Sequence, residues 1–99
     1  MVYISGQISE TDDYMERFEE AEKELKSRGF SVINPAKVNS MMPKETTYDQ
    51  YMQLSFAMLD CADRIYMMDG WEKSRGARME HDRAKEKGME IRYLKDYRG

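Results

Sequence analysis

Glu80 is the side chain of this sequence best suited to covalent chemistry, because its neighbours indicate a closely packed helix face. Ala77, Glu80 and Ala84 recur at spacings of three and four, which places them on one side of a helix. Their small size favours close packing of that side against a sheet, where a carboxylate is costly unless it is paired or used. The alternative is a solvated glutamate on a highly charged helix.

The start of the same helix is suited to binding an anion. Ser74 is expected to cap it, so that the serine hydroxyl and nearby backbone amides could hold a phosphate. Gly76 and Ala77 leave room for a ligand against the helix. The chain contains no Gly-x-x-x-x-Gly-Lys phosphate loop, so a lysine cradle is not expected.

Two other segments could present chemistry at the ends of strands. Residues 3–9 read YISGQIS, and Gly6 directly after a β-prone run would let the backbone approach a ligand closely. A lone glycine in that place is also typical of an ordinary turn. Asp69 ends another β-prone run and could serve as an acid, a base or a ribose ligand, or could begin an Asp-Gly turn.

Composition argues against several other classes of protein. His81 is the only histidine and Cys61 the only cysteine, so we expect no histidine-based triad and no metal site. The formal charge of −3 comes from interspersed acids and bases, which is not the pattern of a nucleic-acid binder. The lone cysteine indicates a reducing, cytoplasmic setting, and no apolar run approaches the roughly 20 residues that span a bilayer. Trp71 could stack on a base or cover the sheet.

The elements that would position these residues alternate between strands and helices. Thr11 is expected to cap a first helix that ends at Gly29, Thr47 and Gln50 form a capping box for a second, and a third runs from near Ser74 to Gly88. Ala36–Glu45 contains Pro43 and shows no clear period, so it is predicted to be a loop. The predicted strands are Val2–Ser5, Phe30–Asn34, Arg64–Met68 and Met89–Leu94.

This order predicts one α/β domain over residues 1–99, with a four-stranded parallel sheet. Helices on both faces would give a three-layer α/β/α, flavodoxin- or Rossmann-like architecture. Ligands of such sheets bind beyond the carboxyl ends of the strands. That rule selects residues 6–9, 34–36 and 69–74.

A second subunit is expected to cover part of the second helix. A chain of 99 residues buries only a modest core. The apolar residues of this helix also cover more of its circumference than one core-facing stripe requires; they are Tyr48, Tyr51, Met52, Leu54, Phe56, Met58 and Leu59. We therefore predict a homodimer or a larger homo-oligomer, unless the Ala36–Glu45 loop folds over the helix.

Three motifs in this order resemble the nucleoside 2-deoxyribosyltransferase superfamily, in particular its short bacterial and phage members. They are Tyr-Ile-Ser-Gly at residues 3–6, Asn34-Pro35, and Ser-x-Gly-Ala-x-x-Glu at residues 74–80. The resemblance runs from Val2 to about Ile91. It implies a flavodoxin-like sheet and cleavage or transfer at a nucleoside N-glycosidic bond, with Glu80 attacking the anomeric carbon and with no cofactor. It also implies an oligomer in which a neighbouring subunit closes the pocket.

Details of the match favour a nucleotide as substrate and water as acceptor. Ser74 stands where the transferases carry an aspartate, and deoxynucleoside monophosphate N-hydrolases have a serine there that contacts the 5′-phosphate. Tyr3 matches a tyrosine beside the sugar in those hydrolases. The chain departs from them at Ser55, where they carry an aspartate near the sugar, with Asp49 and Asp60 as the nearest substitutes. It also has His81-Asp82 after the glutamate, where many members have x-Gly.

The expected function is therefore cleavage of the base–sugar bond of a nucleoside monophosphate. Glu80 would be the nucleophile, and Asp69 or Tyr3 would assist the base or position the sugar. The expected substrate-binding residues are Gly6, Gln7, Ile8, Ser9, Asn34, Ser74, Gly76 and Ala77. Two alternatives stay open: a nucleotide-binding or sensing module without turnover, and a deoxyribosyltransferase that passes the sugar to a second base.

Overall fold

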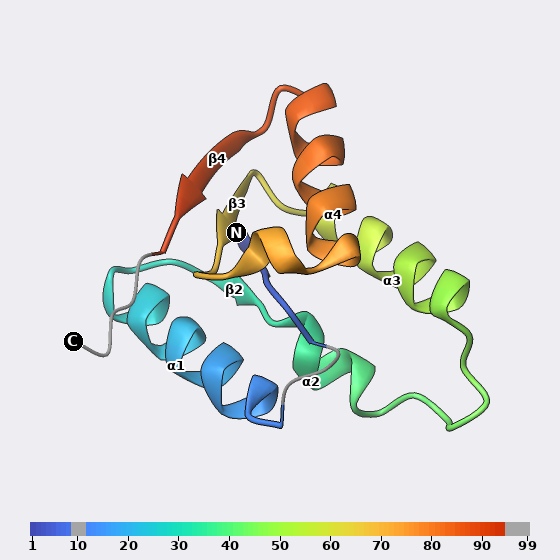
Figure 1. Ribbon diagram of the computed structural model, residues 1–99. Helices are drawn as coiled ribbons and strands as arrows, with labels where there is room; N and C mark the ends of the chain where they lie inside the picture. The colour runs from blue at the N-terminus through green and yellow to red at the C-terminus, as the bar shows by residue number, and fades with distance from the viewer. Residues whose placement is uncertain (9–11, 95–99) are drawn as a thin grey trace.

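The computed structural model describes residues 1–8 and 12–94, which form one parallel sheet with helices on both faces (Figure 1). The strands lie in the order β2-β1-β3-β4, and each β1 residue from Val2 to Ser5 has a partner on β3. The predicted four-stranded α/β fold is confirmed. The bounds of the strands are β1 Val2–Ser5, β2 Val32–Ile33, β3 Arg64–Met67 and β4 Glu90–Tyr93.

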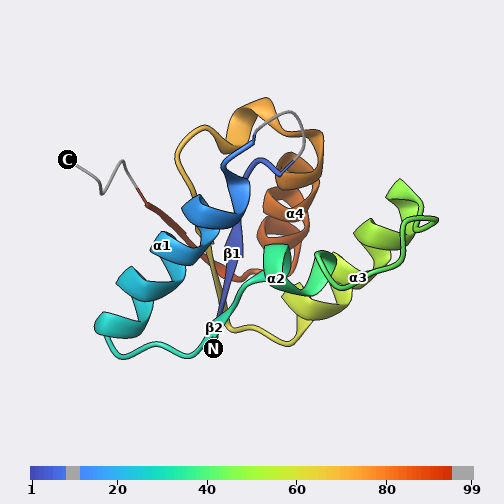
Figure 2. The same ribbon diagram turned by 90° about the horizontal axis from the view of Figure 1, so that it is seen from below.

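The helices divide between the two faces of the sheet, which gives three layers. Figure 2 shows α1 on one side of β1, and α4 and α3 on the other. The bounds are α1 Tyr14–Ser27, α2 Pro35–Asn39, α3 Tyr48–Asp60 and α4 Arg75–Glu86, with a single 3₁₀ turn, η1, at Trp71–Lys73. Each face has its own apolar core, one centred on Phe18 and Leu25 of α1, the other on Leu59 and Ala77 of α3 and α4.

Alternation along β1 decides which side chains meet α4. Val2 and Ile4 pack in the core on the α1 side, whereas Tyr3 packs in the core on the α4 side. Successive side chains of a strand point to opposite faces, so Ser5 points the same way as Tyr3. The first strand thus presents two hydroxyl groups to α4.

The prediction of a loop over Ala36–Glu45 is wrong in its first part, because α2 occupies Pro35–Asn39. The Asn34 side chain accepts a hydrogen bond from the backbone N–H of Ala36 at 3.0 Å, and this caps the helix. Proline at the first helical position has a suitable fixed φ and no N–H that needs a partner. The same cap ends the second strand at Ile33, earlier than predicted.

The other predicted helix ends agree with the structure, except that α1 begins at Tyr14 after an N-cap at Asp13, later than a cap at Thr11 predicts. Thr47 and Gln50 form the capping box of α3, and the Ser74 hydroxyl accepts a hydrogen bond from the N–H of Ala77 at 3.2 Å. Gly88 follows α4 with φ of +70°, a conformation that favours glycine. Thr11, the predicted cap of the first helix, lies outside the described residues. Within residues 1–8 and 12–94, none of the helices has both the length and the apolar character needed to cross a membrane.

Candidate functional site

The Glu80 carboxylate lies on the buried side of α4 and accepts hydrogen bonds from two hydroxyl groups of β1. The Tyr3 hydroxyl donates to Oε2 at 2.7 Å and the Ser5 hydroxyl donates to Oε1 at 2.5 Å. The Ser55 side chain of α3 also hydrogen-bonds to the Glu80 carboxylate. Glu80 is only 7% exposed. The interpretation of Glu80 as a solvated surface glutamate is therefore wrong, because α4 turns this position onto the sheet.

The partners of Glu80 are neutral, and this determines its protonation. Burial raises the pKa of Glu80 to about 7, although hydrogen bonds from Ser5, Tyr3 and Ser55 act in the opposite direction. Burial, together with the nearby Glu80 charge, raises the pKa of Tyr3 well above its ordinary value. Tyr3 therefore stays a hydrogen-bond donor, whereas Glu80 exchanges its proton near neutral pH.

Glu80 forms part of the wall of a cavity of about 420 Å³. This volume is within the roughly 300–1,000 Å³ range of small-molecule sites. The wall combines apolar and aromatic surface with a few polar groups, and comes from the carboxyl end of β1 and from α1, α2, α3 and α4. Its residues are Gly6, Ile8, Tyr14, Phe18, Pro35, Asn39, Tyr48, Tyr51, Met52, Ser55, Ser74, Arg75, Gly76, Ala77 and Glu80.

The first turn of α4 forms the polar end of this cavity. Ser74 and Arg75 both line it, and the Arg75 guanidinium lies 5.6 Å from the centre of the Tyr48 ring. A Cβ atom on Gly76 would lie 3.3 Å from the Met52 sulfur and 3.6 Å from the Tyr48 hydroxyl oxygen. Gly76 thus allows α3 and α4 to approach closely, so that a helix N-terminus and a cation face the same space.

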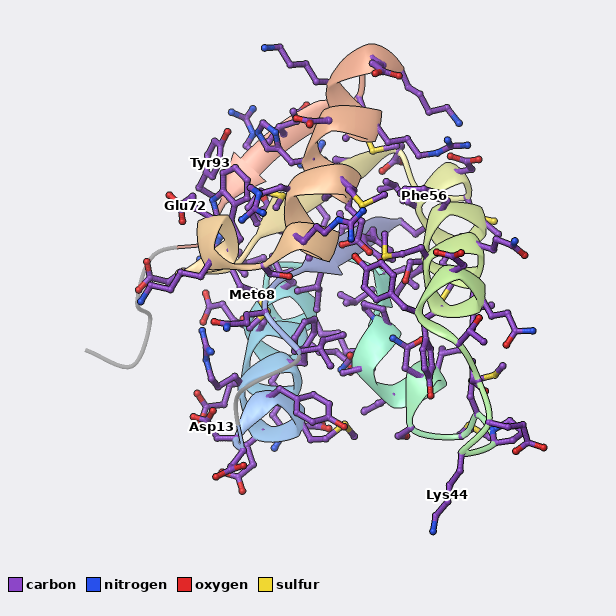
Figure 3. The ribbon with its side chains drawn as sticks, turned by 45° about the vertical axis from the view of Figure 1, so that its right-hand side comes forward. Asp13, Lys44, Phe56, Met68, Glu72 and Tyr93 are labelled. Atoms are coloured by element: carbon purple, nitrogen blue, oxygen red, sulfur yellow. The ribbon has the colours of Figure 1, made fainter. Side chains whose placement is uncertain are left out.

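Gly6 is required sterically at the end of β1. A Cβ atom there would lie 2.9 Å from the sulfur and 3.1 Å from the Cβ of Met68, which is labelled in Figure 3. Met68 directly follows β3, so the chain after β1 passes over the neighbouring strand with no space for a side chain. The glycine therefore serves packing, and its backbone also contributes to the cavity wall.

The structure brings most of the expected site residues together. Six of them line the cavity, namely Gly6, Ile8, Ser74, Gly76, Ala77 and Glu80, while Tyr3 lies behind Glu80 and is bonded to it. Gln7 is half-buried but is not part of the wall. Ser9 lies outside the described residues.

Asn34 and Asp69, both expected at the site, lie away from the cavity wall. Asn34 uses both ends of its amide for structure, since it caps α2 and donates to the Glu22 carboxylate at 3.0 Å. Asp69 is exposed, and its backbone carbonyl accepts from Arg17 at 2.9 Å. Gly70 after it has φ of +83°. The Asp-Gly turn, left open by the sequence, is thus the conformation found.

Trp71 and His81 also pack outside the cavity. The indole stacks on the imidazole with ring centres 4.5 Å apart, and a ring nitrogen of His81 lies 3.2 Å from the Tyr93 hydroxyl. Figure 3 shows Tyr93 on β4 close to the η1 segment that carries Glu72. Trp71 therefore covers the end of the sheet and is not available to stack on a ligand in the cavity.

Sequence reasoning missed several residues of the wall. Tyr48 and Met52 share one face of α3 with Ser55, the position that the resemblance placed near the sugar, so helical periodicity could have added both. Ser5, which donates to Glu80 but is not part of the wall, could have been recovered from its alternation with Tyr3. Asn39 and Arg75 gave no such signal. Asp49 and Asp60, the substitutes considered for a second carboxylate, do not line the cavity, and Asp60 is bound by Arg83 and Lys87.

The assembled site is a small cavity, partly open to solvent, that combines one carboxylic acid with a helix N-terminus and a cation. Among the residues that the structure describes in the wall, Glu80 is the only carboxylic acid and Arg75 the only cation. In residues 1–8 and 12–94, no group of three or more histidine, cysteine, aspartate or glutamate side chains could hold a metal ion. The arrangement is suited to nucleophilic or proton-transfer chemistry on a ligand that carries an anionic group.

Comparison with known proteins identifies the family of the chain. No curated protein and no solved structure matches it significantly. A family model matches residues 1–93, nearly the whole chain, which includes every described element of the fold and every residue of the cavity wall. The protein belongs to this family, which is described as a domain of unknown function (DUF4406).

Proposed function

We propose that this protein is a nucleotide N-glycosidase that cleaves the base–sugar bond of a nucleoside monophosphate through a covalent intermediate on Glu80. The observation that carries the proposal is the buried Glu80 carboxylate, held by the Tyr3 and Ser5 hydroxyls in a cavity whose other end is the first turn of α4. The resemblance of the motifs at residues 3–6 and 74–80 to the nucleoside 2-deoxyribosyltransferase superfamily supports the same chemistry.

The reaction has two displacements at the anomeric carbon. In the first, an oxygen of ionised Glu80 bonds to that carbon while the N-glycosidic bond breaks, and the base leaves with the bonding electrons and takes up a proton from water. In the second, a water oxygen bonds to the same carbon, the glycosyl ester breaks, and the carboxylate is regenerated with loss of the water proton. A carboxylate nucleophile divides one difficult substitution into two easier ones.

The groups around Glu80 prepare it for this role. Tyr3 and Ser5 each donate to a different carboxylate oxygen, which fixes the plane of the group and stabilises its ionised form. Burial removes the water that would otherwise solvate and weaken the nucleophile. With a pKa of about 7, a large fraction of Glu80 is ionised at neutral pH.

The phosphate of the substrate would lie at the N-terminus of α4. Ser74, Arg75 and the free backbone amides of this turn supply donors and positive charge at one end of the cavity. A nucleoside monophosphate should therefore bind more tightly than its nucleoside, by about tenfold or more, and Ser74→Ala should reduce the difference. Calorimetric titration of both ligands tests this, and equal affinities would contradict the assignment.

Binding without turnover is a second candidate function, and one observation favours it. Glu80 is the only carboxylic acid in the described part of the cavity wall, so no second acid stands there to protonate the departing base. The structural features would be the same in a nucleotide-sensing module. Turnover measurements, rather than affinity, separate the two functions.

The decisive experiment incubates the protein with a panel of ribo- and deoxyribonucleoside monophosphates and measures released base and sugar phosphate by chromatography. Free base together with free sugar phosphate supports hydrolysis, whereas a new nucleoside formed with an added second base indicates transfer. Binding with no product from any member of the panel, at enzyme concentrations comparable with substrate, would contradict the proposal in favour of the binding module.

We further propose that a second copy of the chain covers the exposed end of α3. Figure 2 shows this helix and the segment before it projecting from the body of the molecule. Met41 is 84% exposed and Tyr48, which also lines the cavity, is 47% exposed. Apolar and aromatic surface of this kind is typical of interfaces. Sedimentation at micromolar concentration should give a dimer or larger species, and a monomer that still cleaves nucleotides would contradict this.

A further inference from the structure

Asn39 has an unused hydrogen-bonding group in the wall of the cavity. It is the last residue of α2, and its Oδ1 atom is shielded from solvent without a hydrogen-bond partner among the described residues. Asn34, just before the same helix, instead has partners for both its Oδ1 and its Nδ2. An acceptor buried without a partner destabilises the free protein, so a ligand that supplies a donor would remove a penalty already present.

The Asn39 side chain can present this oxygen to a ligand at small cost. The last torsion of an asparagine side chain is broad and shallow, so the amide can turn about it without strain. The helix itself is fixed from behind: Glu22 of α1 accepts from Asn34 at 3.0 Å and pairs with Lys37 of α2 at 3.0 Å. A movable amide on a fixed helix is the arrangement expected of a residue that selects among similar ligands.

The sheet order places Asn39 at the end of the cavity that the base would occupy. In the order β2-β1-β3-β4, α2 follows β2 and α4 begins beyond β3, while the donors to Glu80 come from β1 between them. A ligand with its phosphate at Ser74 and its anomeric carbon at Glu80 would extend its third part toward α2. In a nucleotide, that part is the base.

We propose that Asn39 selects adenine through the edge of the base that carries the N6 amino group and the ring nitrogen N7; this inference rests on the nucleotide substrate proposed above. The amino group would donate to the unpartnered Oδ1, and Nδ2 would donate to the ring nitrogen. Such paired contacts of asparagine with adenine discriminate by about tenfold or more against a base that lacks the donor. Hypoxanthine has an oxo group in place of the amino group, so O6 and N7 are both acceptors and neither orientation of the amide can pair with both.

The test measures binding in a Glu80→Gln background, so that no substrate is consumed. Deoxyadenosine and deoxyinosine monophosphates share N7 and differ next to it in an amino or an oxo group. We expect deoxyadenosine monophosphate to bind at least about tenfold more tightly than deoxyinosine monophosphate. Adding Asn39→Leu should abolish this ratio while leaving the affinity for ribose 5-phosphate, which has no base, within about twofold.

Asn39→Asp is the matched control, because it keeps an acceptor in the same place. Its charge will weaken the binding of all phosphates, but the amino-to-oxo ratio should persist. A ratio near one in the parent protein, a preference for the oxo base, or a ratio unchanged by Asn39→Leu would each overturn the assignment. Circular dichroism of both variants checks that α2 and the fold are retained.

This test can fail independently of the proposed hydrolysis. If the protein with Glu80 intact releases base but Asn39→Leu keeps the preference, the role of Asn39 is wrong and the hydrolase stands. If the preference depends on Asn39 but no base is ever released, the glycosidase proposal fails and Asn39 remains the specificity residue of a binding module.

Discussion

Two buried glutamates of this protein have opposite electrostatic surroundings. Glu22 on α1 is 6% exposed and Glu80 on α4 is 7% exposed, so little of either side chain touches water, but Glu22 lies close to the surface whereas Glu80 lies deep in the protein. Lys26, Lys37 and Asn34 surround Glu22 and hold its pKa at about 2, despite a burial effect in the opposite direction. The partners of Glu80 are neutral hydroxyls, and burial raises its pKa to about 7.

The difference teaches that burial alone does not mark a reactive carboxylate. The Glu22 carboxylate has a structural role, since it joins α1 to α2 through an ion pair with Lys37 and a hydrogen bond from Asn34. Glu80 faces a cavity and has no cation bonded to it among the described residues. A carboxylate that is held by neutral donors beside a cavity is available to a ligand. A carboxylate that is paired with lysines stabilises the packing of the helices instead.

The largest expected contrast between the two sites is in catalysis. Glu80→Gln should lower the rate of base release at least a hundredfold to ten-thousandfold, because it removes the nucleophile while keeping the shape. Glu22→Gln should change the rate only a few-fold, since glutamine can still accept the hydrogen bond from Asn34. Steady-state rates on the best nucleotide of the panel give the comparison. Similar losses in the two variants would remove the distinction drawn between the two sites.

The same two substitutions should change stability in opposite directions. Between pH 4.5 and 7 the folded protein binds more protons at Glu80 than the unfolded chain does, so its contribution to the unfolding free energy falls as pH rises through that window. A shift from 4.5 to about 7 corresponds to roughly 3 kcal/mol. Glu80→Gln should therefore stabilise the protein at pH 8 by up to about 3 kcal/mol, and much less at pH 4.5.

At Glu22 the sign is reversed. Its lowered pKa contributes stability that is present above pH 4.5 and lost as pH falls toward about 2. Glu22→Gln should destabilise the protein at pH 7 by about 1–2 kcal/mol, because Lys26 and Lys37 lose their partner at a partly exposed site. Urea unfolding at several pH values measures both variants, and a parallel pH dependence in the two would contradict the assigned surroundings.

The smallest effect concerns the two hydroxyls that lower the pKa of Glu80. Removing either one by Tyr3→Phe or Ser5→Ala should raise that pKa further, by about one unit or less, and should shift the rise of the pH–rate profile to higher pH. The rate at high pH should fall only about tenfold, because the nucleophile is still present. Thr47→Ala, which affects only the exposed cap of α3, is the control and should leave the profile in place.

The local sequence was sufficient for the fold class and for one half of the site. Alternating strand and helix patterns predicted the parallel α/β sheet, and the spacing of Ala77, Glu80 and Ala84 placed the glutamate on the buried face of α4. Ser74 and the capping box at Thr47 were readable because a cap depends on residues only three apart. Each of these features depends on residues that are close in sequence, so one segment is enough to predict it.

Only the tertiary structure decided which groups meet Glu80 and what occupies the far wall of the cavity. Tyr3 and Ser5 are more than 70 residues away from Glu80 in sequence. Because these partners are uncharged, burial raises the pKa of Glu80. The short helix α2 was hidden because Asn34-Pro35 is typical of a strand end as well as of a helix start, and it brings Asn39 to the site. Whether a buried carboxylate meets a lysine or a hydroxyl depends on the packing of distant elements, and no local pattern of residues encodes that choice.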